Sequence, residues 1–296
     1  AGATIVAIAE SSSKPDLRSL GALYDMFLGS SRLLFDGVRY TLAIKQKKIP
    51  LLYDHQLISI DQTPGGLRGQ LASPKNKIME SVTSFDADVV CMGYGFLPSN
   101  VLLRALGCAH HYDESRRQLV VSRSKNFETT VPKVYAIGDC AGLGGAYAAG
   151  EEGVISGLHA AVRAGYQPGK TFLKEAELAK TKLARHRRFQ SGLWRIFSTP
   201  QLNTHLTSSD TEVCRCESVT MGQINDAIQS GCVSIAEVKQ RTRAGMGRCQ
   251  GRYCAPLLAD LLTDISGCPV DEESFFAPRV PIVPVRIGDI TEPPES

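Results

Sequence analysis

Apolar runs alternate with helix-period stretches over the first part of the chain. The expected elements are a buried strand over 3–9, a helix over 33–47 and strands over 51–53, 56–61 and 67–72. The turn signal Pro64-Gly65-Gly66 lies between the last two strands. A strand, a helix and then a β-meander are typical of a nucleotide-binding α/β unit.

A second group of apolar runs ends in glycines. The expected elements are strands over 87–95, 118–122 and 134–139, and helices over 99–106, 146–164 and 173–194. Gly165 closes the helix that starts at Ala146. The helix over 173–194 is basic and less apolar, which favours a solvated linker between domains.

From residue 212 the pattern changes to short amphipathic helices. Thr220 with Gln223, and Ser234 with Glu237, have the spacing of capping boxes at helix starts. A further helix presents the leucines 257, 258, 261 and 262 on one face. This predicts an all-α module of about sixty residues, a size at which a metal often supplies missing stability. The proline-rich tail from Asp271 is expected to be extended.

Composition narrows the class of protein. The 296 residues carry a net charge of +3, too small to indicate binding to nucleic acid or to an anionic membrane. No apolar run has the length of a transmembrane span, and no leader peptide is evident. Nine cysteines in a chain of this length suit metal ligands and buried thiols in a cytoplasmic protein better than a disulfide scaffold.

Four cysteines near the end of the chain carry the sharpest chemical signal. Cys214 and Cys216 form one pair, and Cys249 and Cys254 form another. Thiolates select zinc, copper(I) or iron–sulfur clusters. A [2Fe–2S] cluster takes four cysteines. Structural zinc also accepts four, although Cys-x-Cys is a less typical zinc spacing. Four unrelated packed thiols remain a third interpretation.

The sequence around these cysteines is specific. Cys214-Arg-Cys-Glu-Ser-Val-Thr, followed by Arg243-Ala-Gly-Met-Gly-Arg-Cys-Gln-Gly-Arg-Tyr-Cys254, resembles the bacterioferritin-associated-ferredoxin-like (BFD-like) [2Fe–2S] module over about 212–270. The resemblance implies that the four cysteines hold a [2Fe–2S] cluster.

A second candidate site lies at the end of the expected strand 134–139. The segment Val134-Tyr-Ala-Ile-Gly-Asp-Cys-Ala-Gly-Leu-Gly-Gly-Ala146 is similar to the second FAD motif of flavoproteins. That similarity implies FAD binding by Gly138, Asp139, Gly145 and Ala146, with the carboxylate on a ribityl hydroxyl and the helix start near the phosphates. A Gly-x-Gly-x-x-Gly loop occurs nowhere in the sequence, which puts in question whether this chain alone holds FAD.

Two further groups have weaker signals. Glu10 ends the first expected strand, where an acid can meet a nucleotide ribose; a vestigial or solvated strand-end acid is the alternative. Cys108, His110, His111 and Asp113 crowd together without a metal-ligand spacing, so a surface turn is expected there. Cys91, Cys232 and Cys268 are expected to be packed thiols.

Taken over nearly its whole length, the chain resembles the family of the opine oxidase large subunits (octopine or nopaline type). Related families are the large subunits of dye-linked proline or hydroxyproline dehydrogenases and of hydrogen cyanide synthase. The resemblance implies an α/β fold: an FAD/NAD(P)-binding Rossmann-like unit, incomplete at its N-terminus, and a small all-α [2Fe–2S] domain. Because the chain starts without Met and inside an apolar run, we expect an N-terminally truncated fragment.

The family implies an oxidoreductase acting on the CH–NH bond of opines or amino acids, as one subunit of a cytoplasmic complex. A flavin-containing partner subunit oxidises the substrate, and this subunit relays electrons through FAD and the cluster to a small-molecule acceptor. A second flavin or a nucleotide shared with the partner is a further possibility. The alternatives are an NAD(P)H-dependent flavin reductase that feeds the cluster, and a non-catalytic, zinc-stapled assembly or regulatory module.

The expected division of the chain follows from these motifs. It consists of a nucleotide-binding remnant over 1–85, the C-terminal half of an FAD-binding domain over 86–166, a helical linker over 167–210, the [2Fe–2S] domain over 211–270 and the tail over 271–296.

Overall fold

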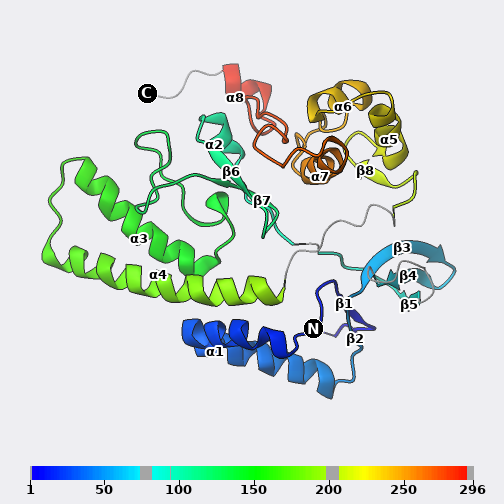
Figure 1. Cartoon of the computed structure of the whole chain (residues 1–296), viewed down its shortest axis with the longest axis horizontal. Helices are drawn as coiled ribbons and strands as arrows, with labels where there is room; N and C mark the ends of the chain where they lie inside the picture. The colour runs from blue at the N-terminus through cyan, green and yellow to red at the C-terminus, as the bar shows by residue number, and fades with distance from the viewer. Residues whose placement is uncertain (1, 74–81, 94, 198–206, 292–296) are drawn as a thin grey trace.

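The computed structural model describes residues 2–73, 82–93, 95–197 and 207–291, and its elements are drawn in Figure 1. It is a mixed α/β structure with several small sheets, a layer of long helices and a separate cluster of short helices. No helix among the described residues is long and apolar enough to cross a membrane.

The N-terminal part holds two small sheets. Strand β1 (Ile8–Glu10) pairs in parallel with β2 (Leu51–Tyr53), so the strand expected over 3–9 forms only at its end. Strands β3 (Gln56–Thr63), β4 (Gly66–Ala72) and β5 (Thr83–Ala87) form an antiparallel meander, in which the expected 64–66 turn joins the first two. The order of strand, helix and meander is therefore as predicted.

Three long helices form one layer, with α4 between α1 and α3 (Figure 1). Helix α1 spans Leu20–Gln46 after the short 3-10 turn η1 (Leu17–Ser19), with a break in helical geometry at Ser30. Helix α3 spans Ala146–Arg163 and α4 spans Lys170–Ile196, close to the expected ranges. Helix α4 buries Ala179, Leu183 and Phe189, so the solvated linker expected over 167–210 describes only one face of it.

Glycines let α1 and α4 approach closely. A Cβ placed on Gly29 would lie 2.6 Å from the Phe189 backbone nitrogen, and one on Gly192 would lie 2.5 Å from the Ala22 carbonyl oxygen. The predicted helix over 33–47 omits the first half of α1, which contains Gly21 and Gly29. Glycine lowers helix propensity, but here the close contact between helices outweighs that cost.

Two predicted strands do not form. Residues 88–93 have no regular secondary structure and are mostly exposed, and no described strand pairs with them. Residues 134–137 contain a single isolated bridge, between Tyr135 and Glu128, before the 3-10 turn η2 (Gly138–Ala141). A strand needs a continuous run of hydrogen-bonded partners; among the described residues, 88–93 have none and 134–137 have only the one bridge. Helix α2 (Val101–Ala105) and the hairpin β6 (His110–Asp113) and β7 (Gln118–Val121) lie between these two segments.

The surface position expected for Cys108, His110, His111 and Asp113 holds for His111, which is exposed, but not for Cys108 and His110. Cys108 is 1% exposed, and the His110 side chain is fully buried on strand β6. Cys108 packs in a core cluster with Leu103, Val121 and Ala136, and the C-terminal tail contacts the hairpin through Glu272 and Phe275.

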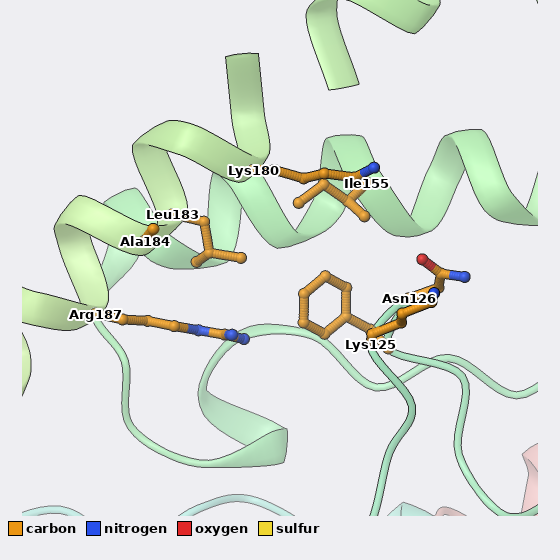
Figure 2. Close-up of a pocket in the computed structure, with 8 residues that line it drawn as sticks. Lys125, Asn126, Ile155, Lys180, Leu183, Ala184 and Arg187 are labelled. Carbon is orange, nitrogen blue, oxygen red and sulfur yellow. The ribbon is translucent and has the colours of Figure 1, made fainter. Parts of the chain in front are cut away.

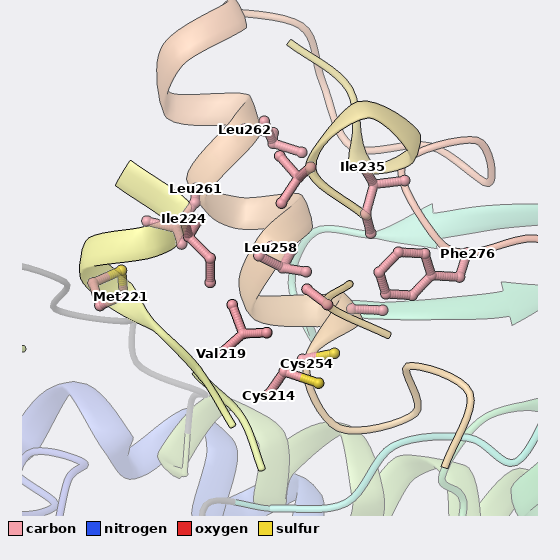
Figure 3. Close-up of a cluster of buried hydrophobic side chains, with 13 residues drawn as sticks. Cys214, Val219, Met221, Ile224, Ile235, Cys254, Leu258, Leu261, Leu262 and Phe276 are labelled. Carbon is pink, nitrogen blue, oxygen red and sulfur yellow. The ribbon is translucent and has the colours of Figure 1, made fainter. Parts of the chain in front are cut away.

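The C-terminal module is a compact unit around its own core. It contains β8 (Glu212–Cys214), β9 (Val219–Thr220), α5 (Met221–Gln229), α6 (Ile235–Thr242) and α7 (Ala255–Ser266). Both predicted capping boxes are present, at Thr220 and Ser234. Figure 3 shows the core, in which Ile224, Val238 and Leu258 are fully buried.

The tail after α7 is irregular up to α8 (Ile287–Thr291), and part of it packs against the module through Phe276. Of the cysteines expected to be packed, Cys232 lies half-buried against the module core, whereas Cys91 and Cys268 are exposed.

Candidate cofactor sites

Two loops bring the four cysteines of the C-terminal module together. Cys214 ends strand β8 and Cys216 lies in the following turn, while Cys249 lies in the loop after α6 and Cys254 is the N-cap of α7. The Cys214 and Cys254 side chains lie next to each other, with their sulfur atoms on the same side (Figure 3), and they interact. The Cys216 and Cys249 side chains interact in the same way. The sequence-predicted set is therefore one constellation.

A glycine makes the approach of the two loops possible. A Cβ on Gly247 would lie 2.2 Å from the Cβ of Cys216, which no side chain can occupy. Glu217 and Arg243 form an ion pair across the same two loops, at 3.0 Å. The loop that carries Cys249 and the turn that carries Cys216 are therefore packed together without a side chain between them.

Backbone N–H groups face the sulfur atoms. Gly245 donates to the Cys214 sulfur over 3.4 Å. Burial would raise the pKa of Cys249, but the Cys216 side chain and backbone N–H groups lower it below its usual value. Those N–H groups belong to residues 251, 252 and 253. N–H groups directed at sulfur stabilise a thiolate and tune the reduction potential of an iron–sulfur cluster.

The two inner thiols are buried. Cys214 and Cys254 are each 2% exposed and belong to the hydrophobic core of the module. Burial, and then the neighbouring Cys214, raise the pKa of Cys254 to about 12. A metal centre bound here must therefore displace a proton from Cys254, because only the thiolate is a ligand.

Four cysteine thiolates can serve two kinds of centre. Structural zinc takes four ligands around one ion, whereas a [2Fe–2S] centre spreads its four thiolates over two irons. Among the described residues, no three or more His, Cys, Asp or Glu side chains are placed to hold a single metal ion. The thiols that interact in pairs, Cys214 with Cys254 and Cys216 with Cys249, can supply two ligands to each of two irons.

The second predicted site surrounds the start of α3. Gly138 has φ 66° and opens η2, and Asp139 beside it is exposed to solvent. Gly145 is the N-cap of α3 with φ 83°, so Ala146 and its successors begin the helix without a side-chain cap. The free N–H groups of a first helical turn suit a phosphate, and the exposed carboxylate suits a hydroxyl. The residues present therefore fit one part of a flavin dinucleotide.

A buried ion network holds this site and was not predicted. Glu152 is 5% exposed; it accepts two hydrogen bonds from Arg123, at 2.8 and 3.1 Å, and one from Arg187, at 3.1 Å. It also accepts the Gly138 N–H over 3.1 Å, which fixes the turn before Asp139. Burial alone would raise the pKa of Glu152, but the two arginines and this N–H lower it.

A sequence signal for Glu152 exists. Ala148, Glu152 and Ile155 recur at helical spacing, and all three are buried in α3. A carboxylate on the apolar stripe of a helix requires a buried cationic partner. Arg123 stands apart from α3 in sequence, so the partner could not be identified from spacing.

Glu10 does not join either site. It ends β1 and accepts a hydrogen bond from the Ser12 N–H over 2.9 Å. The carboxylate thus closes a local turn, which fits the alternative of a strand-end acid at least as well as ribose binding.

One pocket of about 300 Å³ lies between α3, α4 and the loop before Phe127 (Figure 2). It is mainly apolar, with basic side chains at its rim; its lining residues are Lys125, Asn126, Phe127, Ile155, Lys180, Leu183, Ala184 and Arg187. Its volume is at the lower end for a small-molecule site. It adjoins the Glu152 network through Arg187 and does not include Asp139 or the cysteines.

Comparison with known families matches both regions. Residues 30–165 match the pyridine nucleotide-disulphide oxidoreductase family, whose members bind FAD and NAD(P). Residues 212–264 match the BFD-like [2Fe–2S] binding domain. These matches confirm the predicted flavoprotein fold and the [2Fe–2S] module.

Homologous proteins are similar over most of the chain. Hydrogen cyanide synthase subunit HcnB of Pseudomonas aeruginosa is 31% identical over 271 residues, covering 87% of this chain and 56% of the relative. An opine oxidase subunit of Rhizobium meliloti, of the type predicted from the sequence, is 30% identical over 199 residues, covering 67% and 42%. The chain thus spans about half the length of these relatives.

A solved structure shares the fold. The crystal structure of L-proline dehydrogenase from P. horikoshii superimposes with a TM-score of 0.65 over 86% of this chain and 48% of that one, at 17% identity. At this identity the likeness concerns the arrangement of the chain in space. It agrees with the mixed α/β fold predicted for the chain.

Proposed function

We propose that this chain, with its pyridine nucleotide-disulphide oxidoreductase segment and its BFD-like [2Fe–2S] binding domain, is an electron-transfer subunit of an amine-oxidising complex. The observation that carries the proposal is the convergence of four cysteines on two adjacent loops, where the Gly245 N–H donates to the Cys214 sulfur and Gly247 leaves no room for a side chain beside Cys216.

In this proposal Cys214, Cys216, Cys249 and Cys254 hold the cluster. Gly138, Asp139, Gly145 and Ala146 hold part of FAD, and Glu10 meets a nucleotide ribose. When bound, the flavin exchanges electrons in pairs or singly and the cluster exchanges them one at a time.

The residues of the chain position these groups and set their surroundings. The core of the module shields Cys214 and Cys254 from water. Glu152 holds the turn that presents Asp139. The five-part division of the chain, with boundaries near 85, 166, 210 and 270, belongs to the same proposal.

The substrate is proposed to be an opine or another secondary amine or amino acid. Its CH–NH bond is oxidised at a flavin of a partner subunit in the cytoplasm, and the electrons leave through this chain to a small-molecule acceptor. The names of the homologous subunits support this choice.

The metal centre is tested first by anaerobic purification of the chain. A [2Fe–2S] protein is expected to contain iron and sulfide in equal amounts and to show visible bands that dithionite bleaches. Cys249→Ser should abolish these bands. Cys268→Ser, which changes an exposed cysteine of the same module, should retain them. A colourless protein with stoichiometric zinc would overturn the proposal.

The relay is tested in the complex with the amine-oxidising subunit. Cys249→Ser should lose nearly all dye-linked turnover while partner binding persists. The partner's oxidation site is intact in this variant, but without the cluster its electrons cannot be transferred to the dye. Turnover at the wild-type rate in a cluster-free variant would exclude an obligatory role of this chain as electron relay.

A further inference from the structure

The segment after α7 joins the cysteine module to the oxidoreductase segment. Arg104 of α2 donates to the Phe276 carbonyl over 3.0 Å and to the Glu272 carbonyl over 3.3 Å. The Glu272 side chain accepts the His110 N–H over 3.1 Å. On the same face, the Phe275 ring lies 6.2 Å from the Tyr112 ring. Residues 272–276 are therefore bound to α2 and β6 by directional contacts.

The other side of this segment lies on the cysteine loops. A Cβ on Gly245 would come within 2.4 Å of the Phe276 ring, and one on Gly251 within 2.1 Å. These two glycines supply N–H groups to the sulfur atoms of Cys214 and Cys249. Phe276 is 8% exposed and belongs to the core of the module (Figure 3). Its ring therefore covers the backbone that faces the sulfur atoms.

The contact between α2 and the tail buries the charged Arg104 side chain. The Arg104 side chain is 9% exposed, and Glu272 is its ionic partner at 3.5 Å. Burying a cation is unfavourable unless it is paired. The tail supplies Arg104 with its counter-charge, Glu272, and Arg104 supplies the Phe276 carbonyl with a hydrogen-bond donor.

We propose that residues 272–276 are a cover for the metal centre, in which Phe276 excludes water from the N–H donors of Gly245 and Gly251. Arg104 holds this cover through the Phe276 carbonyl and so couples it to the oxidoreductase segment. The cover lies outside the matched [2Fe–2S] domain, which ends at residue 264. The proposal rests on the proposed function for the identity of the centre.

Two measurable properties follow from a water-excluding ring. Solvent exposure is one of the factors that set the potential of a cluster. The reduced centre carries one more negative charge, so water favours it, and removal of the ring should raise the reduction potential. Access of water and chelators to the sulfur atoms should also increase the rate at which the centre is lost.

The test compares Phe276→Ala with Phe172→Ala in the whole chain. Phe172 is 62% exposed on α4 and serves as the matched control. Phe276→Ala should lose its visible absorbance several-fold faster than wild type under a ferrous chelator, and its reduction potential should move upward. Phe172→Ala should match wild type in both measurements.

Two more variants keep the test decisive. If Phe276→Ala does not assemble the centre, Phe276→Leu keeps a smaller cover and should show both changes at reduced size. Arg104→Gln should change the potential in the same direction, whereas Arg39→Gln, at a 71% exposed side chain, should not.

The outcomes separate the two proposals. A wild-type chain without iron overturns the proposed function. A wild-type chain with its cluster, and Phe276 variants whose chelation rate and potential equal those of Phe172→Ala, overturn the cover and leave the electron relay standing.

Discussion

Glu152→Gln tests the buried ion network beside the flavin motif. The carboxylate accepts four hydrogen bonds, three from arginine side chains and one from the Gly138 N–H, and its side chain is 7% exposed. An amide has one acceptor oxygen and no charge, and its NH₂ group faces the donors of Arg123. The substitution therefore leaves Arg123, whose side chain is 18% exposed, as a partly buried cation without a counter-charge.

The magnitude follows from these contacts. A hydrogen bond to a charged group contributes about 1.5–3 kcal/mol, and Gln can keep about half of the four bonds. The Arg187 side chain is 55% exposed, so the loss of its ion pair with Glu152 changes the free energy of unfolding little. Breaking a buried pair by removing one partner costs about 3–5 kcal/mol. We expect the lower end of that range, about 3 kcal/mol of unfolding free energy.

The assay is urea unfolding followed by the fluorescence of Trp194, the single tryptophan, which lies on α4. The control is Glu177→Gln on α4. The Glu177 side chain is 73% exposed and pairs with Lys180. This substitution should change the free energy of unfolding by less than about 0.5 kcal/mol. A Glu152→Gln midpoint equal to that of Glu177→Gln would refute the reasoning.

The effect should also depend on pH. Arg123 and Arg187 hold the pKa of Glu152 below its ordinary value in the folded protein, despite burial. A carboxyl group with a depressed folded-state pKa stabilises the fold fully above the ordinary carboxyl range, and this contribution is lost as the pH falls through the folded-state pKa. The difference between wild type and Glu152→Gln should therefore be constant near neutral pH and shrink in acid.

Two further substitutions test packing and helix initiation. Gly192→Ala places a methyl group 2.5 Å from the Ala22 carbonyl oxygen, so α1 and α4 must separate, and the free energy of unfolding should fall by about 3 kcal/mol. The control is Gly157→Ala on α3, where the added methyl group would have no neighbouring atom within 4 Å. It should raise the free energy of unfolding by about 0.5–1 kcal/mol. Ser234→Ala removes the cap that accepts the Glu237 N–H at the start of α6 and should cost about 1 kcal/mol, measured by circular dichroism during urea unfolding. Equal stability of Gly192→Ala and Gly157→Ala, or an unchanged midpoint for Ser234→Ala, would contradict the respective argument.

Local signals in the sequence were the reliable ones. The capping boxes at Thr220 and Ser234, and the start of α3 after Gly145, depend on residues within one helical turn of each other, and they were predicted correctly. The strand over 87–95 was not, because a strand depends on a neighbour that its own sequence does not contain. Among the described residues no such neighbour is present, and Val89, 72% exposed, lies in solvent where a buried strand was expected.

The same distinction applies to the candidate sites. The cysteine ligands could be named because a thiolate donor is a property of the residue and its spacing. Their environment could not, because it comes from distant parts of the chain: the Phe276 ring reaches the cysteine loops from the tail, and Arg104 reaches that tail from α2. Sequence spacing gives no information on either contact.

Metal binding and folding are linked in the C-terminal module. Cys214 and Cys254 are ligand candidates and also members of the same hydrophobic core as Val219, Ile224 and Leu258. A module of this size has little apolar surface to bury, so a centre that crosslinks β8 to the start of α7 contributes directly to its stability. The residues that surround the sulfur atoms are therefore the residues that hold the module together, and Phe276 extends that shared core to the oxidoreductase segment.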